Sequence, residues 1–313
     1  MQENAAVGAE STSASEDASS SRGLGFAVLS YLMWGTLPLY MKAVDFIPAV
    51  EVVAHRVLWS LPVAGVILLA LGRTADIKAA LREPRTMLMA ALTAAIISAN
   101  WAIYVWAIAV DRTVEAALGY YINPLMTVLL GAALLGERLN RYQMVAVALA
   151  VLAVVILTVD AGGLPWVSLA LAGTFAAYGY LRKTLPVGPS QGFFLEVMLL
   201  ALPSLGYVIW LETSGQGHFF ADGGANVTLM MLAGPVTAIP LILYGIGAKA
   251  LRISTVGILQ YISPTIIALM AVFIFGEPFG PVRVVAFALI WAGLALYTWS
   301  MFYGPGKAVK AGR

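Results

Sequence analysis

Ten long apolar runs divide this chain of 313 residues, and they limit what it can fold into more than any other feature. A membrane-spanning helix needs about 20 apolar residues. Only 11% of the residues are charged, against about 25% in a typical soluble domain. We therefore predict an all-α membrane protein with ten transmembrane helices, near residues 24–43, 49–71, 86–109, 115–135, 142–159, 165–181, 190–211, 227–248, 254–275 and 282–303.

The positive charges indicate how these helices are oriented. If the N-terminus is cytoplasmic, all but four of the 18 Lys and Arg residues fall in segments on the cytoplasmic side. The exceptions are Lys42, Arg56, Arg112 and Arg283. Because Lys and Arg concentrate in cytoplasmic loops, we expect both termini inside and a multi-pass protein of the bacterial inner membrane.

The two ends of the chain differ from the apolar runs. Residues 1–22 are rich in Ser, Ala and acidic residues, so we expect a disordered tail. This segment also lacks the basic start of a secretory signal. Residues 304–313 form a short basic tail that we place in the cytoplasm.

An internal repeat divides the remainder into two halves, 23–160 and 161–303. At an offset of 140 residues, 115–158 align with 255–298 without a gap. Tyr121-Ile122-x-Pro124 matches Tyr261-Ile262-x-Pro264, and Gly136-Glu137 matches Gly276-Glu277. A repeat of five helices places its second copy upside down in the membrane. This inverted arrangement is typical of secondary transporters with a midplane site, although a duplicated bundle without a transport role is the alternative.

Several segments carry a family resemblance over roughly residues 24–303. They are SYLMWGTLPLYMKAV (30–44), EVVAHRVLWS (51–60), ANWAIYVWAI (99–108), ALGYYINPL (117–125), LLGERL (134–139) and LQYISPTI (259–266). The sequence resembles the EamA branch of the drug/metabolite transporter superfamily, and within it the RarD permeases. The resemblance implies the drug/metabolite transporter fold of ten helices and an export or exchange activity, but it supplies no substrate.

The second predicted helix carries the most informative polar residues. Glu51, His55 and Trp59 follow at a spacing of four, which places them on one helix face. Together with Arg56 they can bind an anionic or zwitterionic substrate, and His55 can carry a proton. The alternative is an interfacial ion pair, with Lys42 as a candidate partner.

Further candidates lie on the third, fourth and ninth predicted helices. Asn100 either lines a cavity with Trp101 and Tyr104 or only bonds a neighbouring helix. Pro124 and Pro264 are expected to kink their helices and to free backbone carbonyls. We expect them to shape a pocket lined by the matched residues Tyr120, Tyr121, Asn123, Gln260, Tyr261 and Ser263.

Three acidic residues and a set of aromatic residues complete the candidates. Glu196 lies within the run FFLEVMLL and either couples transport to protons or pairs with Arg182 or Lys183. For Glu137 and Glu277 we favour ion pairs with Arg138, Arg141 or Arg283. Trp34, Tyr178, Trp299 and Tyr303 belong either to a cavity wall or to the interfacial aromatic belt.

Several function classes are disfavoured. There is no Cys, and there are two His residues, which argues against a metal site. Gly188–Gly192 fits G-x-S-x-G, but a loop between membrane helices is not a nucleophile elbow. With no ATP-binding motif, we expect no enzyme, no cofactor and no nucleic-acid partner. The predicted function is a secondary transporter that exports or exchanges amino-acid-like or drug-like solutes. A channel or structural protein and, less favoured, a lipid enzyme are the alternatives, and a homodimer is left open.

Overall fold

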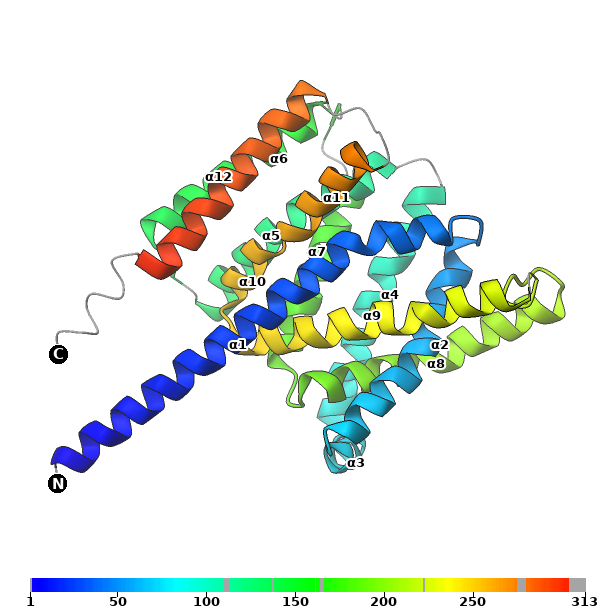
Figure 1. Cartoon of the computed structure of the whole chain (residues 1–313), viewed down its shortest axis with the longest axis horizontal. Helices are drawn as coiled ribbons and strands as arrows, with labels where there is room; N and C mark the ends of the chain where they lie inside the picture. The colour runs from blue at the N-terminus through cyan, green and yellow to red at the C-terminus, as the bar shows by residue number, and fades with distance from the viewer. Residues whose placement is uncertain are drawn as a thin grey trace.

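The computed structural model describes residues 2–109, 113–136, 138–160, 162–163, 166–221, 223–274 and 280–303, and every regular element within these ranges is a helix. The helices form one bundle, and α1 protrudes from it at its N-terminal end (Figure 1). Their bounds are α1 Gln2–Ala43, α2 Ala49–Ala70, α3 Thr74–Arg82, α4 Pro84–Ala109, α5 Thr113–Leu135, α6 Arg141–Asp160, α7 Trp166–Thr184, α8 Pro189–Thr213, α9 Gly224–Ala250, α10 Ile253–Leu259, α11 Ile262–Phe273 and α12 Pro281–Tyr303.

Length and hydropathy identify a membrane protein. Among the described residues, six helices contain a segment long and apolar enough to cross a bilayer: α1, α2, α4, α6, α8 and α9. Shorter apolar stretches lie at 119–135, 253–267 and 284–297. The prediction of an all-helical membrane protein is confirmed, because every described element is helical and these spans carry very few charges.

The repeat extends well beyond the segment in which the sequence reveals it. The first residues of α8, α9, α10 and α12 lie 140 positions after those of α2, α4, α5 and α6. These helices therefore correspond without an insertion or a deletion, and any residue of the first half can be paired with its counterpart in the second.

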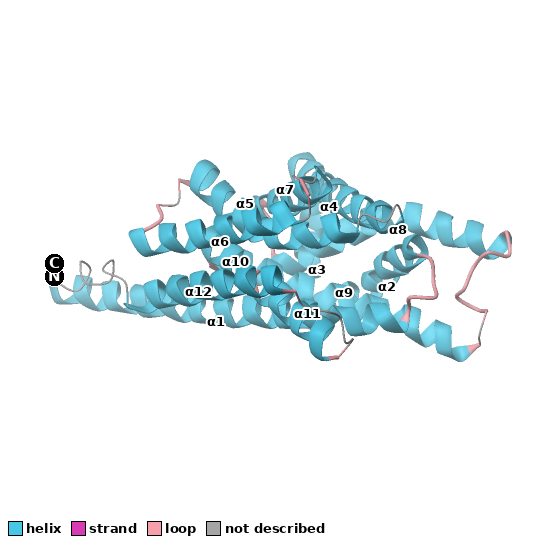
Figure 2. Cartoon of the chain, turned by 90° about the horizontal axis from the view of Figure 1, so that it is seen from above, coloured by secondary structure: helices cyan, strands magenta, loops and turns pink. Residues whose placement is uncertain are grey.

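The packing of the helices also repeats between the halves. The α1–α9 contact has its counterpart in α7–α4, the α1–α11 contact in α7–α5, and the α2–α9 contact in α8–α4. The α2–α8, α5–α10 and α6–α12 contacts join counterparts directly. Figure 2 shows α6 and α12 side by side at one edge of the bundle. Exchanging the two halves thus leaves the main contacts unchanged.

Two equivalent hydrogen bonds join the halves at α1–α9 and α4–α7. Ser30 Oγ donates to the Pro240 carbonyl over 2.8 Å, and Asn100 Nδ2 donates to the Leu171 carbonyl over 2.9 Å. Pro240 lies 140 residues after Asn100, and Leu171 lies next to the counterpart of Ser30. Asn100 therefore makes the interhelical bond that was one of its two predicted roles.

The N-terminal segment differs from the prediction. Disorder was expected over residues 1–22, but α1 is helical from Gln2 onward. Alanine has the highest helix propensity, and this segment contains five Ala and no Pro before Ser20. Extending a helix that is already formed avoids the cost of nucleation, so the membrane span can propagate its helix into this polar segment.

The ninth predicted helix and the segment 72–85 also differ from the prediction. The run 254–275 is interrupted at Gln260 and Tyr261, between α10 and α11. A proline ring clashes with the carbonyl four residues before it, and Gln260 lies four residues before Pro264. The connection 72–85, which lies between two predicted apolar runs and for which no helix was predicted, contains the amphipathic helix α3.

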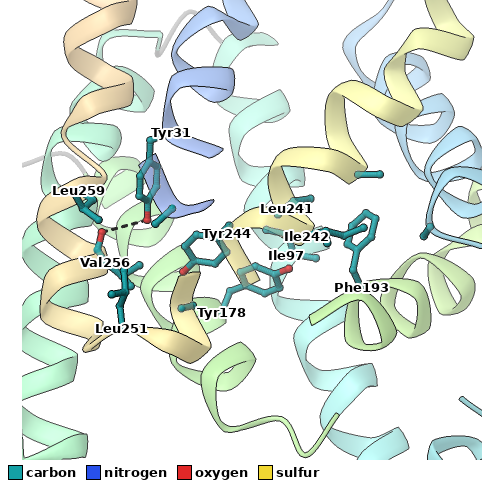
Figure 3. Close-up of a cluster of buried hydrophobic side chains, with 14 of the residues drawn as sticks. Tyr31, Ile97, Tyr178, Phe193, Leu241, Ile242, Tyr244, Leu251, Val256 and Leu259 are labelled. Atoms are coloured by element: carbon teal, nitrogen blue, oxygen red, sulfur yellow. Dashed lines mark hydrogen bonds between the residues drawn. The ribbon is translucent and has the colours of Figure 1, made fainter. Parts of the chain in front are cut away.

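A buried aromatic and aliphatic core joins the halves near the middle of the bundle (Figure 3). Tyr31 of α1 donates its hydroxyl to the Val256 carbonyl over 3.2 Å, and Tyr178 stacks on Tyr244 with ring centres 6.5 Å apart. At Gly234 the backbones of α9 and α2 approach so closely that a Cβ would overlap the Trp59 carbonyl.

We predict that Gly234→Val lowers the melting temperature of the purified protein, because overpacking typically costs about 1–3 kcal/mol. Gly206→Val is the control, since a Cβ at that helical glycine meets nothing within 4 Å. Thermal unfolding in detergent measures both variants. Equal melting temperatures would contradict the close α2–α9 packing.

Candidate functional site

A single arginine lies at the centre of one polar and aromatic cluster inside the bundle. Arg56 lies eight residues into α2, roughly 10 Å along the helix. Its Nε donates to Thr237 Oγ1 of α9 over 2.9 Å, and its guanidinium carbon lies 5.2 Å from the centre of the Trp101 ring of α4. The phenols of Tyr40, Tyr104 and Tyr120 lie within its electrostatic range. We call these six residues the Arg56 cluster.

The cluster keeps part of its surface accessible. Tyr104 of α4 and Tyr120 of α5 meet edge to face with ring centres 6.0 Å apart. Tyr120 is 46% exposed, and Tyr40, Arg56, Trp101 and Tyr104 are partly exposed. The Tyr40 hydroxyl donates to the Leu229 carbonyl over 3.1 Å, and the guanidinium and the aromatic rings of the cluster are only partly covered by protein.

The other polar residues predicted on α2 lie under the connection between α8 and α9. Glu51, 1% exposed, accepts a hydrogen bond from the backbone N–H of His218 over 2.7 Å and lies 2.8 Å from its ring Nδ1. His55 stacks on Phe219 at 4.9 Å, and Trp59 stacks on the same ring at 6.0 Å. Neither ring nitrogen of His55 has a hydrogen-bond partner among the described residues.

His218 is the residue that sequence reasoning missed. The sequence shows His218 only as one of two histidines. It lies in the connection between α8 and α9, 167 residues from Glu51, and no sequence spacing relates the two. Asn226 supports it by donating to the His218 carbonyl over 2.9 Å. Lys42, the partner considered for this face, instead pairs with Asp45 at 2.7 Å on the surface.

A matching contact occurs in the other half. Gln191 of α8, the counterpart of Glu51, donates through Nε2 to Asp76 Oδ2 of α3 over 2.8 Å. The first turn of α2 thus binds the connection that follows α8, and the first turn of α8 binds the connection that follows α2. We call the Glu51–His218 and Gln191–Asp76 contacts the two latches.

Glu196 lies in a buried network with Arg182. The carboxylate, 2% exposed, lies 3.5 Å from Arg182 Nη1 and accepts a hydrogen bond from the Tyr178 hydroxyl over 3.0 Å. Arg182 also donates to the Pro189 carbonyl over 2.9 Å. The pairing with Arg182 considered for this glutamate is thus present. Glu196 is the counterpart of Arg56, so the two halves carry opposite charges at one repeated position.

The residues predicted around the two prolines have a more closed environment. Asn123, Gln260 and Tyr261 are buried, and Gly257 of α10 packs against the Pro124 carbonyl. Thr127 Oγ1 lies 3.4 Å from Gln260 Oε1, and Ser263 donates to the Tyr31 carbonyl over 2.7 Å. Tyr121 is partly exposed and meets Phe287 edge to face at 5.1 Å. Gln260 and Tyr121 link α5 to α10 and α12, and Ser263 links α11 to α1. Of the residues predicted around the prolines, Tyr120 belongs to the Arg56 cluster and the others do not.

Of the aromatic candidates, Trp34 and Tyr178 lie in the central core. Trp34 contacts Phe175 at 5.9 Å and Tyr244 at 5.5 Å. Trp299 meets Tyr142 edge to face at 5.1 Å at the α6–α12 edge. Glu137 and Glu277 lie outside the described residues. Within the described ranges, no group of three His, Cys, Asp or Glu side chains could hold a metal ion.

We predict that His218→Ala loosens the connection at 214–221. The substitution removes a hydrogen bond to a buried carboxylate, worth about 1.5–3 kcal/mol. The detached state therefore becomes more populated, and chymotrypsin should cut at Phe219 and Phe220 on the order of tenfold faster. Gln216→Ala, an exposed neighbour, is the control. An unchanged cleavage rate would show that His218 does not hold the connection.

Known proteins resemble this chain over most of its length. The EamA-like transporter family matches residues 21–159. Protein RarD of Streptomyces exfoliatus is 44% identical, covering 88% of this chain and 88% of its own. An uncharacterized transporter of Bacillus subtilis, YojE, is 38% identical, covering 91% of this chain and 96% of its own.

A crystal structure of a protein with 23% identity superposes with a TM-score of 0.68, covering 89% of this chain and 96% of the other. At this identity the superposition shows the fold alone. The sequence relatives carry the assignment: the chain belongs to the EamA-like transporter family, among the RarD permeases, and is a multi-pass membrane transporter.

Proposed function

We propose that this protein is a secondary transporter of the bacterial inner membrane that exports or exchanges small metabolites by alternating access. Its ten membrane spans would be α1, α2, α4 to α9, α10 with α11, and α12, with both termini in the cytoplasm. The observation that carries the proposal is the Arg56 cluster, where α1, α2, α4 and α5 of the first half meet Thr237 of the second.

The exchangeable packing of the halves supports alternating access. Inverted repeats let a transporter adopt two conformations that open to opposite sides, around a site between the repeats. Here the α1–α9 and α4–α7 contacts are equivalent, and each includes a side-chain hydrogen bond to a backbone carbonyl at a matching position. The conformation described would then be one of two related by exchanging the halves.

The Arg182–Glu196 network supports a role in energy coupling. A carboxylate in a membrane-spanning helix is costly to retain unless it is paired or functional, and Glu196 is buried beside Arg182 and the Tyr178 hydroxyl. We assign proton coupling to Glu196 in the first place. His55, whose ring nitrogens have no partner among the described residues, is the second candidate.

A channel or a structural membrane protein is the alternative function class. Saturable counterflow separates a carrier from a channel, because only a carrier exchanges labelled for unlabelled solute through one site. The screen uses proteoliposomes with labelled amino acids, aromatic carboxylates and chloramphenicol. We expect saturable counterflow of at least one solute, and its absence from all of them in folded protein would favour a role other than transport.

We predict that Arg56→Gln abolishes this counterflow while the melting temperature changes little. The substitution keeps a polar side chain near Thr237 but removes the only positive charge of the cluster. Arg73→Gln, the same change at an exposed residue, is the control. Wild-type counterflow by the Arg56 variant would place the substrate elsewhere.

We also predict that Glu196→Gln leaves solute exchange intact but abolishes its coupling to protons. An amide still accepts a hydrogen bond from the Tyr178 hydroxyl but cannot bind and release a proton. Counterflow should persist, whereas accumulation driven by a pH gradient should fall to the level of protein-free liposomes. Retained gradient-driven accumulation would remove Glu196 from coupling, and a large fall in melting temperature would indicate that its main role is to pair Arg182.

A further inference from the structure

The guanidinium of Arg56 is incompletely satisfied. An arginine offers five N–H donors, and Nε uses one of them on the neutral hydroxyl of Thr237. Its other contact is the face of Trp101, 5.2 Å away. No carboxylate whose side chain the structure describes lies within 4.0 Å of Arg56, and the side chain of Glu115, in the first turn of α5, is not among those described.

The other partly or fully buried cations with described contacts differ from Arg56. Arg182 has Glu196 and the Pro189 carbonyl, and Lys249 donates to the Leu185 carbonyl over 2.6 Å. Lys183 donates to the Ala248 carbonyl over 2.9 Å and also to that of Leu251. Each binds at least one strong backbone or carboxylate acceptor, whereas the acceptor of Arg56 is a hydroxyl.

An unpaired charge at this depth of a membrane helix is expensive to maintain. The low dielectric of the bilayer penalises a lone ion, and charged side chains there usually pair or mark a substrate path. The face of the Trp101 ring offsets part of this cost. Among the described side chains, the guanidinium of the cluster thus has no anionic partner.

We infer that the substrate supplies the anionic partner, and that it is a monocarboxylate with an aromatic or apolar body. A guanidinium matches the two oxygens of a carboxylate, and one unpaired cation neutralises one negative charge. The partly exposed rings of Trp101, Tyr104 and Tyr120 provide a surface for the body.

The same geometry makes an ammonium group on the substrate unnecessary. The six residues of the Arg56 cluster include no carboxylate, and Glu51, on the same helix, is occupied by His218. A desamino acid should therefore bind about as well as the corresponding amino acid. This inference deepens the proposed function and rests on it, because it assigns the substrate class to the same cluster.

The test measures binding directly, on the full chain in detergent, by thermal shift and calorimetry. The probes are 3-phenylpropionate, phenylalanine, 3-phenylpropionamide, phenylethylamine and phenyl phosphate. We expect saturable binding of both carboxylates and at least tenfold weaker binding of the amide and the amine. Arg56→Gln should remove the preference for acid over amide, Arg56→Lys should retain part of it, and Arg73→Gln should retain all of it.

Several outcomes would overturn the inference. They are equal binding of acid and amide, an acid preference that survives Arg56→Gln, binding of phenyl phosphate without the carboxylates, and no binding of either acid to the wild type.

Counterflow of the same probes separates this inference from the proposed function. If the acids bind but show no counterflow, the carboxylate site is supported and the proposed transport is contradicted. If another solute shows counterflow that Arg56→Gln does not change, transport is supported and the carboxylate site at Arg56 is contradicted.

Discussion

Hydrocarbon offers no hydrogen bonds, and this constraint shapes where the polar groups of the described helices lie. Backbone groups are satisfied within helices, and the polar side chains concentrate between helices. Ser30 and Asn100 bond carbonyls of neighbouring helices, and Arg182 and Lys183 bond carbonyls near helix ends. Arg56 differs from these two cations, because its described contacts are a hydroxyl and the face of an aromatic ring.

Much of the fold follows from the sequence, because lipid contact makes apolar runs easy to recognise. The predicted runs correspond to α1, α2, α4 to α9, α10 with α11, and α12 to within a few residues at most ends. The errors arise where another force acts. The polar start of α1 continues a helix that is already formed, the break before Pro264 is steric, and α3 is amphipathic rather than apolar.

The candidate site was harder to predict. Helix periodicity shows which residues share a helix face, but it does not show which other helix packs against that face. Glu51, His55 and Arg56 were expected to act together. In the structure, Glu51 and His55 lie under His218 and Phe219, whereas Arg56, about 100° around the helix from His55, joins Trp101 and Thr237. The partners come from distant parts of the chain, and only the folded structure brings them together. The offset of 140 residues between the halves does relate distant residues, because it places Glu196 at the position that Arg56 holds in the first half.

The two latches have a consequence for the energy of any rocking motion between the halves. Each joins a long helix of one half to a connection of the other, so such a motion must break the contact or drag the connection with it. One latch joins a carboxylate to a histidine, and the other joins an amide to a carboxylate. The two latches occupy equivalent positions but differ in chemistry, so breaking one does not cost the same free energy as breaking the other. A motion that opened one latch would therefore differ in energy from a motion that opened the other.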